Sequence, residues 1–67
     1  MKNNIRTYRE ARNLTQEQVA RAAGFTLRHF QFIEKGESIP TVYKALKIAD
    51  ILQVDIYTLF NYNQISN

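Results

Sequence analysis

The side chains best suited to chemistry in this sequence lie between positions 26 and 36, in a stretch with the spacing of one short helix. Phe30 and Ile33 are three residues apart and would form its buried face, which leaves positions 27, 28, 31 and 32 turned outward. Two of these positions carry hydrogen-bonding groups, Arg28 and Gln31. The planar guanidinium of arginine can pair with guanine O6 and N7, and a carboxamide can pair with adenine. The pattern is therefore typical of base recognition.

The residues that enzymes use are nearly absent. The chain has no cysteine and a single histidine, His29, with no second metal-binding side chain or nucleophile arranged beside it. Its 67 residues, 45% of them apolar, can form one core but not a roomy substrate cleft as well. We expect no enzyme, no cofactor, no metal and no small-molecule ligand, and we assign His29 to a phosphate-facing rim.

Positive charge is concentrated in the first half of the chain. The net charge is +3, with seven basic and three acidic residues in 1–35 but two basic and three acidic residues in 36–67. A basic half indicates a polyanionic partner on that side. No apolar stretch approaches the roughly 20 residues of a membrane span, and the first four residues lack the apolar run of a signal peptide. We expect a cytoplasmic protein without a membrane partner.

Apolar periodicity and capping residues predict five helices and no strands. Thr15 and Gln18 have the spacing of a capping box, and Gly24 is placed to end the same helix. The predicted helices cover about residues 3–13, 15–24, 26–36, 40–52 and 55–60. The second and third are joined by a tight turn that contains glycine. This is the spacing of a helix-turn-helix over Thr15 to Lys35, in which the second helix enters the major groove of DNA.

Several segments, in register, carry a resemblance to a known family. They are Leu14-Thr15-Gln16, Ala20 with Gly24, Ile33-Glu34-Lys35-Gly36, and a later segment over 46–55. On these residues the chain resembles the Cro/CI-type helix-turn-helix family, also called the xenobiotic-response-element family, over about residues 5–60. The resemblance implies an all-α fold: one five-helix lambda-repressor-like domain over 1–67, with a short polar tail. It also implies binding to operator DNA as a twofold dimer.

The resemblance implies roles for single residues. Matching positions read base edges at 27, 28 and 32, so with Gln31 the predicted base-reading set is Leu27, Arg28, Gln31 and Phe32. Leu27 and Phe32 are apolar where polar residues are usual. They could pack on thymine methyl groups, on a neighbouring helix or, for Phe32, on a protein partner. With His29 added from its place on the helix, the predicted phosphate-binding residues are Thr15, Gln16, Thr26, His29, Lys35, Ser38 and Thr41.

Some of these positions leave a second interpretation open. Gln16 could brace a side chain on the third helix instead of binding DNA, and Arg28 could hold a phosphate without reading sequence. The match further implies that Arg9 and Glu34 form a partly buried ion pair between the first helix and the end of the third. We expect that pair to be structural, because removing one partner would leave a charge unpaired.

The second half of the chain carries more apolar residues than its own core can use. If Ile48, Leu52 and Leu59 face inward, several others must face solvent, which indicates an interface on the near-neutral half. A twofold dimer formed there would separate two reading helices by about 34–36 Å, one turn of B-DNA. The predicted interface residues are Ile51, Ile56, Phe60 and Tyr62.

The sequence therefore predicts a double-stranded-DNA-binding transcriptional regulator that reads the major groove sequence-specifically. We expect a homodimeric repressor of phage, mobile-element or autoregulatory type. An antitoxin or a restriction controller would share the same DNA chemistry and remains an alternative. So does a protein-interaction module on the same fold, which the apolar Phe32 and the apolar second half would suit.

Overall fold

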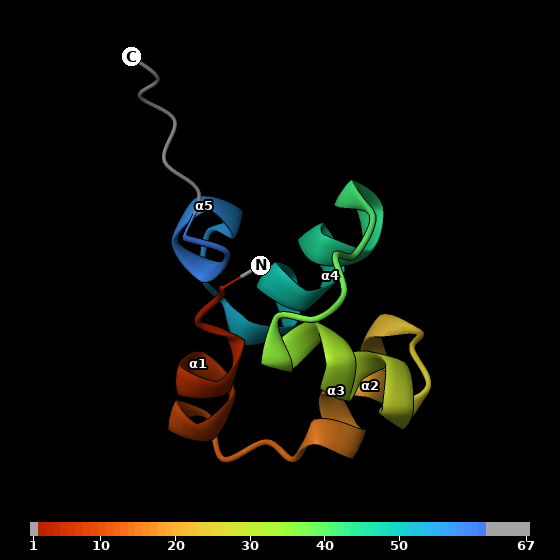
Figure 1. The fold of residues 1–67 in the computed structure, drawn as a ribbon. Coiled ribbons are helices and arrows are strands. Elements are labelled where there is room, and N and C mark those ends of the chain that lie inside the picture. The colour runs from red at the N-terminus through yellow and green to blue at the C-terminus, as the bar shows by residue number, and fades with distance from the viewer. Residues whose placement is uncertain (1, 62–67) are drawn as a thin grey trace.

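The computed structural model describes residues 2–61 as an all-helical domain (Figure 1). Its helices are α1 (Ile5–Ala11), α2 (Gln16–Ala23), α3 (Leu27–Lys35), α4 (Val42–Leu52) and α5 (Ile56–Leu59). No residue within 2–61 is in a strand. The all-α, five-helix prediction is confirmed. In Figure 1, α1 and α5 lie on one side of the molecule and α2 and α3 on the other.

Four of the helices begin at a side-chain cap. At α2 the Thr15 hydroxyl accepts from the Gln18 amide at 3.0 Å, and the Gln18 side-chain oxygen accepts from the Thr15 amide at 2.8 Å. This is the predicted capping box, which satisfies two backbone donors that a helix start leaves unpaired. Thr26, Thr41 and Asp55 cap α3, α4 and α5 in the same way with one side-chain oxygen each.

Left-handed residues end three of the helices. Gly24 and Gly36 close α2 and α3 with φ of 80° and 88°, a conformation that glycine adopts without steric penalty. Gln53 ends α4 with φ of 57°, where the sequence offers no glycine. α1 is shorter than the predicted 3–13, because Asn13 has φ of 58° and so lies beyond the helix.

The core forms where α2 packs on both α3 and α4, and α4 packs on α5. α3 contributes Phe30 and Ile33, both fully buried, so its opposite face is turned outward. A strap before α1 closes the bundle: the Asn4 amide donates to Leu59 O at 2.7 Å, and Asn3 Nδ2 donates to Ile33 O at 2.8 Å. The buried apolar residues are Ile5, Val19, Ala20, Ala23, Phe30, Ile33, Ala45, Ile48, Ala49, Leu52, Leu59 and Phe60.

Candidate nucleic-acid interface

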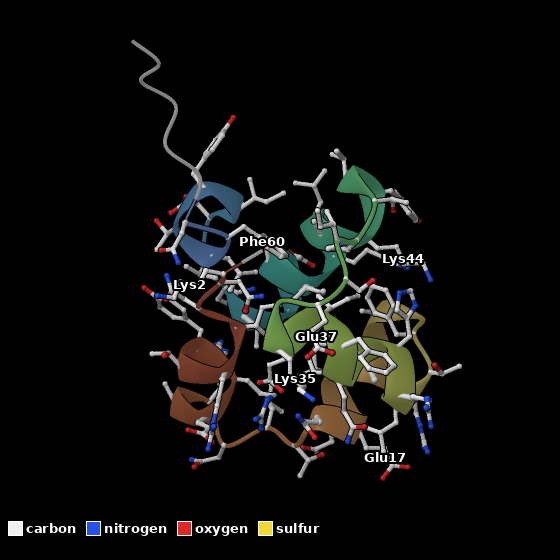
Figure 2. The ribbon with its side chains drawn as sticks, in the orientation of Figure 1. Lys2, Glu17, Lys35, Glu37, Lys44 and Phe60 are labelled. Carbon is white, nitrogen blue, oxygen red and sulfur yellow. The ribbon has the colours of Figure 1, made fainter. Side chains whose placement is uncertain are left out.

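The turn between α2 and α3 is fixed by contacts with α2 and with α4. The Phe25 amide donates to Ala20 O at 2.8 Å, which continues the hydrogen bonding of α2 into the turn. From α4, Lys44 Nζ donates to Gly24 O at 2.6 Å and lies 4.7 Å from the centre of the Phe25 ring (Figure 2). A charged donor on the last carbonyls of α2 complements the negative end of that helix. The angle between α2 and α3 is therefore held by a residue outside the pair.

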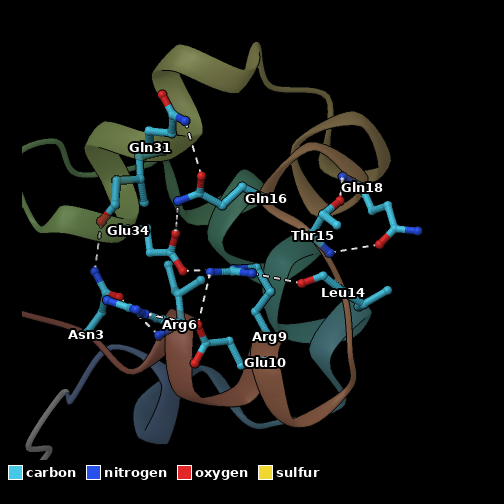
Figure 3. Close-up of polar contacts among 12 residues, drawn as sticks. Asn3, Arg6, Arg9, Glu10, Leu14, Thr15, Gln16, Gln18, Gln31 and Glu34 are labelled. Carbon is cyan, nitrogen blue, oxygen red and sulfur yellow. Dashed lines mark hydrogen bonds and ion pairs between the residues drawn. The ribbon is translucent and has the colours of Figure 1, made fainter.

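A buried ion pair ties α1 to the C-terminal half of α3 (Figure 3). Arg9 Nε lies 2.9 Å from Glu34 Oε2, and the two side chains are only 10% and 5% exposed. The Arg9 guanidinium also donates to Leu14 O at 2.8 Å. The predicted contact between Arg9 and Glu34 is thus present in the structure. Because its guanidinium is enclosed in this way, Arg9 is not available to a partner.

A chain of carboxamides extends from this ion pair to the surface of α3. Gln16 Nε2 donates to Glu34 Oε1, and Gln16 Oε1 accepts from Gln31 Nε2 at 3.1 Å (Figure 3). Gln16 therefore braces α3, the second of the two roles that its position left open. Gln31 is half-buried rather than on the open face, because this bond holds it toward α2. This bond uses one carboxamide N–H of Gln31, and the carboxamide oxygen and second N–H have no hydrogen-bond partner among residues 2–61.

The outer face of α3 is open at Arg28. This side chain is exposed, and its Cζ lies 5.6 Å from the centre of the Phe32 ring. Leu27 and Phe32 are also exposed, at 41% and 36%. The side chains around this point form a shallow surface hollow lined by Gln16, Arg28, Gln31, Phe32 and Lys35. Five of the six predicted base-facing or phosphate-facing positions on α3 are thus accessible, and Gln31 is partly covered.

The predicted phosphate-binding residues lie around the edges of the same surface. Thr15, Thr26 and Thr41 are exposed N-caps, so each hydroxyl accepts from the backbone and keeps its own proton to donate. The His29 ring lies 3.5 Å from Ser38 Oγ and meets Phe25 edge-on. Lys35 is exposed, with its ammonium 3.8 Å from Glu37 (Figure 2). The exposed hydroxyls and cations can hold anions, but only Arg28 on this face has the planar fork for a base edge.

The apolar surface of the second half coincides only in part with the predicted interface residues. Phe60 belongs to the core, with 6% of its surface exposed, and Ile51 and Ile56 are half-buried against the same core (Figure 2). Tyr62 lies outside the described residues. Phe60 therefore offers little surface of its own to a partner. The large apolar side chains that are exposed here are Ile39, Val42, Tyr43, Leu46 and Tyr57.

These exposed residues surround an apolar groove between the start of α4 and α5. Its lining is Ile39, Pro40, Val42, Ala45, Ile56, Tyr57 and Phe60. The periodicity of α4 predicts its buried stripe correctly, and it places Tyr43, which is 68% exposed, opposite that stripe. Val42 is three residues before Ala45 and so lies on the side of the stripe, yet it is 72% exposed, which helical periodicity does not predict.

Within residues 2–61, no group of three or more His, Cys, Asp or Glu side chains is placed to hold a metal ion. The helices found there are too short or too polar to cross a membrane.

Comparison with known proteins gives matches over almost the whole chain. Residues 5–59 match the model of a family described as Helix-turn-helix, of the Cro/CI type. The sequence is 40% identical over 62 residues to an uncharacterized HTH-type transcriptional regulator of Methanocaldococcus jannaschii, which covers 92% of this chain and 94% of the relative. It is 38% identical over 56 residues to the cryptic phage CTXphi transcriptional repressor RstR of Vibrio cholerae, covering 84% of this chain and 50% of the relative.

A solved structure with the same arrangement is the restriction-modification controller protein C.AhdI from Aeromonas hydrophila. The two superpose with a TM-score of 0.75 at 28% identity, covering 84% of this chain and 85% of the controller. A chain of a SinR protein/SinI protein complex superposes with a TM-score of 0.78 at 23% identity, and the match covers 90% of this chain and 59% of the other. At that identity the likeness supports the fold alone.

Proposed function

Because the chain belongs to the Cro/CI-type Helix-turn-helix family, and is therefore a transcriptional regulator with a helix-turn-helix DNA-binding domain, we propose that it reads a specific operator in the major groove with α3. α2 then lies across the backbone at the edge of the groove. The observation that carries this proposal is the orientation of α3. Phe30 and Ile33 are fully buried, while Arg28 on the opposite side is open to solvent.

Arg28 is the principal base reader in this proposal. Its fork pairs with O6 and N7 of a guanine, which discriminates against a wrong base by about 1–3 kcal/mol. Gln31, held by Gln16, presents a fixed carboxamide whose remaining groups match an adenine. Leu27 and Phe32 supply apolar contacts in the groove. Because the buried network of Arg9 supports Gln31, the second reader is preorganised and loses little rotamer freedom on binding.

The remaining predicted residues position the protein on the phosphates. Thr15 and Gln16 lie at the N-terminus of α2, and Thr26 and His29 lie at that of α3, where free amides favour anions. Lys35, Ser38 and Thr41 extend the same surface beyond α3. In Gln16 the two carboxamide groups already hold other side chains, so its backbone amide is the group that contributes to DNA.

We propose further that the protein acts as a homodimer through the apolar surface around Val42 and Tyr57. This surface belongs to the near-neutral half of the chain, and its residues come from α4, α5 and the segment before α4 rather than from α3. Two exposed patches of this kind lose water by packing on each other, which favours self-association. Sedimentation equilibrium should show a concentration-dependent dimer, and Val42→Lys with Tyr57→Lys should shift it to monomer. A wild-type chain that stays monomeric at micromolar concentration, with and without operator, would remove the dimer from the account.

The similarity to a phage repressor and to a restriction-modification controller supports a repressor of phage, mobile-element or autoregulatory type. A protein-interaction module is the second candidate, favoured by the exposed Phe32 and the apolar groove. Salt dependence separates the two. A DNA binder loses affinity with a log–log slope of about −0.9 per neutralised phosphate, whereas a module that binds protein shows no such binding to random duplex.

The decisive test of sequence reading compares selected with random duplex. Duplexes recovered from a random library by the wild-type chain are bound again by Arg28→Ala and by the matched control Arg21→Ala. Arg21 is an exposed arginine of α2, with 80% of its side chain accessible, which lies 3.4 Å from Glu17 and does not line the hollow around Arg28. We expect Arg28→Ala to lower the preference for selected duplex by roughly 10-fold or more, while Arg21→Ala preserves that preference. Equal loss on both duplexes in Arg28→Ala would make Arg28 a phosphate contact and end the base-reading proposal.

A further inference from the structure

Arg28 and Phe32 form a unit on the open face of α3. They are one helical turn apart, and the guanidinium carbon lies 5.6 Å from the centre of the ring. At that distance the cation is attracted to the ring face. Phe32 has no role in the core, since α3 buries Phe30 and Ile33 and leaves Phe32 36% exposed. The ring therefore orients the guanidinium and keeps apolar surface beside it.

The hollow around this unit has a distinctive chemical composition. Its lining combines four side chains that can hydrogen-bond, Gln16, Arg28, Gln31 and Lys35, with a single apolar ring, that of Phe32. In the major groove, guanine presents two acceptors, which suit Arg28. Thymine presents a C5 methyl group beside the O4 acceptor, which suits an apolar ring next to hydrogen-bond donors such as Lys35. The lining thus matches these two base edges placed side by side.

We propose that Arg28 and Phe32 together read a guanine and a neighbouring thymine, and that the thymine methyl group is what Phe32 recognises. Arg28 pairs with the guanine, while Phe32 holds the guanidinium and packs on the methyl group. Their separation of 5.6 Å lies between one and two base-pair steps of about 3.4 Å, so both bases fall within two steps of each other. This inference rests on the proposed function, because it requires α3 to lie in the major groove. It goes further by naming the thymine methyl group as a recognised feature of the operator.

The test removes that methyl group without altering base pairing. Duplexes selected from a random library by the wild-type chain are used, and the guanine is identified as the position whose preference Arg28→Ala loses. Each thymine within two base pairs of it is then replaced singly by uracil. We expect one thymine at which the replacement weakens wild-type binding about fourfold, equivalent to roughly 0.8 kcal/mol for one buried methyl group. The wild-type chain should also bind a duplex with 5-methylcytosine at that position more tightly than a duplex with cytosine there.

The variant arm assigns the effect to Phe32. Phe32→Ala should bind the thymine and uracil duplexes equally. Arg21→Ala is the control, since Arg21 is exposed but does not line the hollow around Phe32, and it should keep the preference. The uracil comparison on the wild-type chain needs no variant, so it stands even if a substitution disturbs folding.

The outcomes separate this inference from the function it rests on. Selected duplexes in which no thymine beside the guanine responds to uracil would overturn it and leave sequence-specific binding intact. So would a Phe32→Ala variant that keeps the full preference, or an Arg21→Ala variant that loses it. A wild-type chain that recovers no preferred duplex at all would contradict the proposed function itself.

Discussion

Neutralising Glu34 should destabilise the fold far more than neutralising an acidic residue at the surface. In Glu34→Gln the side chain keeps its shape, but the Arg9 guanidinium loses its charged partner. The Arg9 side chain is only 10% exposed, so water cannot replace that partner. Removing one member of a buried pair costs about 3–5 kcal/mol. Since a glutamine oxygen can still accept from Arg9, we expect the lower end, about 3 kcal/mol. The total free energy of unfolding of a domain of this size is only roughly 3–10 kcal/mol.

Urea denaturation followed by far-UV circular dichroism measures the effect. The transition midpoint should fall with an unchanged slope, and the melting temperature should fall by about 12 °C or more, at roughly 4 °C or more per kcal/mol. Glu10→Gln is the matched control, because Glu10 also faces Arg9 but at 3.9 Å and with 56% of its side chain exposed. An exposed pair of that kind contributes about 0–1 kcal/mol.

A double variant tests the physical reason. In Arg9→Met with Glu34→Leu no charge is left unpaired, although Leu14 O and Gln16 Nε2 lose their partners, so we expect part of the lost stability to return. If Glu34→Gln is no more destabilising than Glu10→Gln, the pair is no stronger than a surface contact. If the double variant is no more stable than Glu34→Gln, the unpaired charge is not the cause.

Three further predictions concern the helix ends. Thr15→Ala removes the hydroxyl that caps α2 and should lower the free energy of unfolding by about 1 kcal/mol in a thermal melt; an unchanged melt would mean that the cap contributes nothing. Gly24→Ala places an alanine at φ of +80°, with its Cβ 3.4 Å from Lys44 Nζ. Urea denaturation should therefore show a free energy of unfolding lower by roughly 1–2 kcal/mol, and an unchanged value would mean that the alanine is not strained there. The pKa of Asp55 lies below its usual value because the Thr58 hydroxyl, and then the Thr58 backbone amide, donate hydrogen bonds to the carboxylate. The stability that this lowered pKa gives is present above the pKa of the unfolded state and is lost as pH falls through the lower pKa of the folded state. Asp55→Asn should therefore reduce the fall in melting temperature below about pH 4. Parallel plots of melting temperature against pH for the two proteins would contradict this.

Helix ends could be predicted from sequence because caps are local contacts. Thr15 bonds a residue three positions away, and Gly24 and Gly36 adopt a backbone conformation that other residues avoid. The orientation of α3 also follows from sequence, since Phe30 and Ile33 fix which face is buried. These local rules account for most of the helix-turn-helix.

The contacts that the sequence does not predict join residues far apart in the chain. The sequence leaves open that Gln16 braces the third helix, but only the folded arrangement shows that the contact is with Gln31, at 3.1 Å between the carboxamides. Lys44 reaches the turn at Gly24 only because α4 packs on α2. Phe60 has the spacing of an exposed residue beyond a short helix, but it is buried in the core cluster.

The central claim is that the open face of α3 is the face of the molecule that meets DNA. Two-dimensional NMR of the isotopically labelled chain, titrated with a selected duplex, answers this residue by residue. We predict that the largest shifts fall on Arg28, Phe32 and Lys35 of α3 and at the start of α2. Shifts concentrated on Val42, Tyr43 and Tyr57, with α3 unaffected, would contradict it.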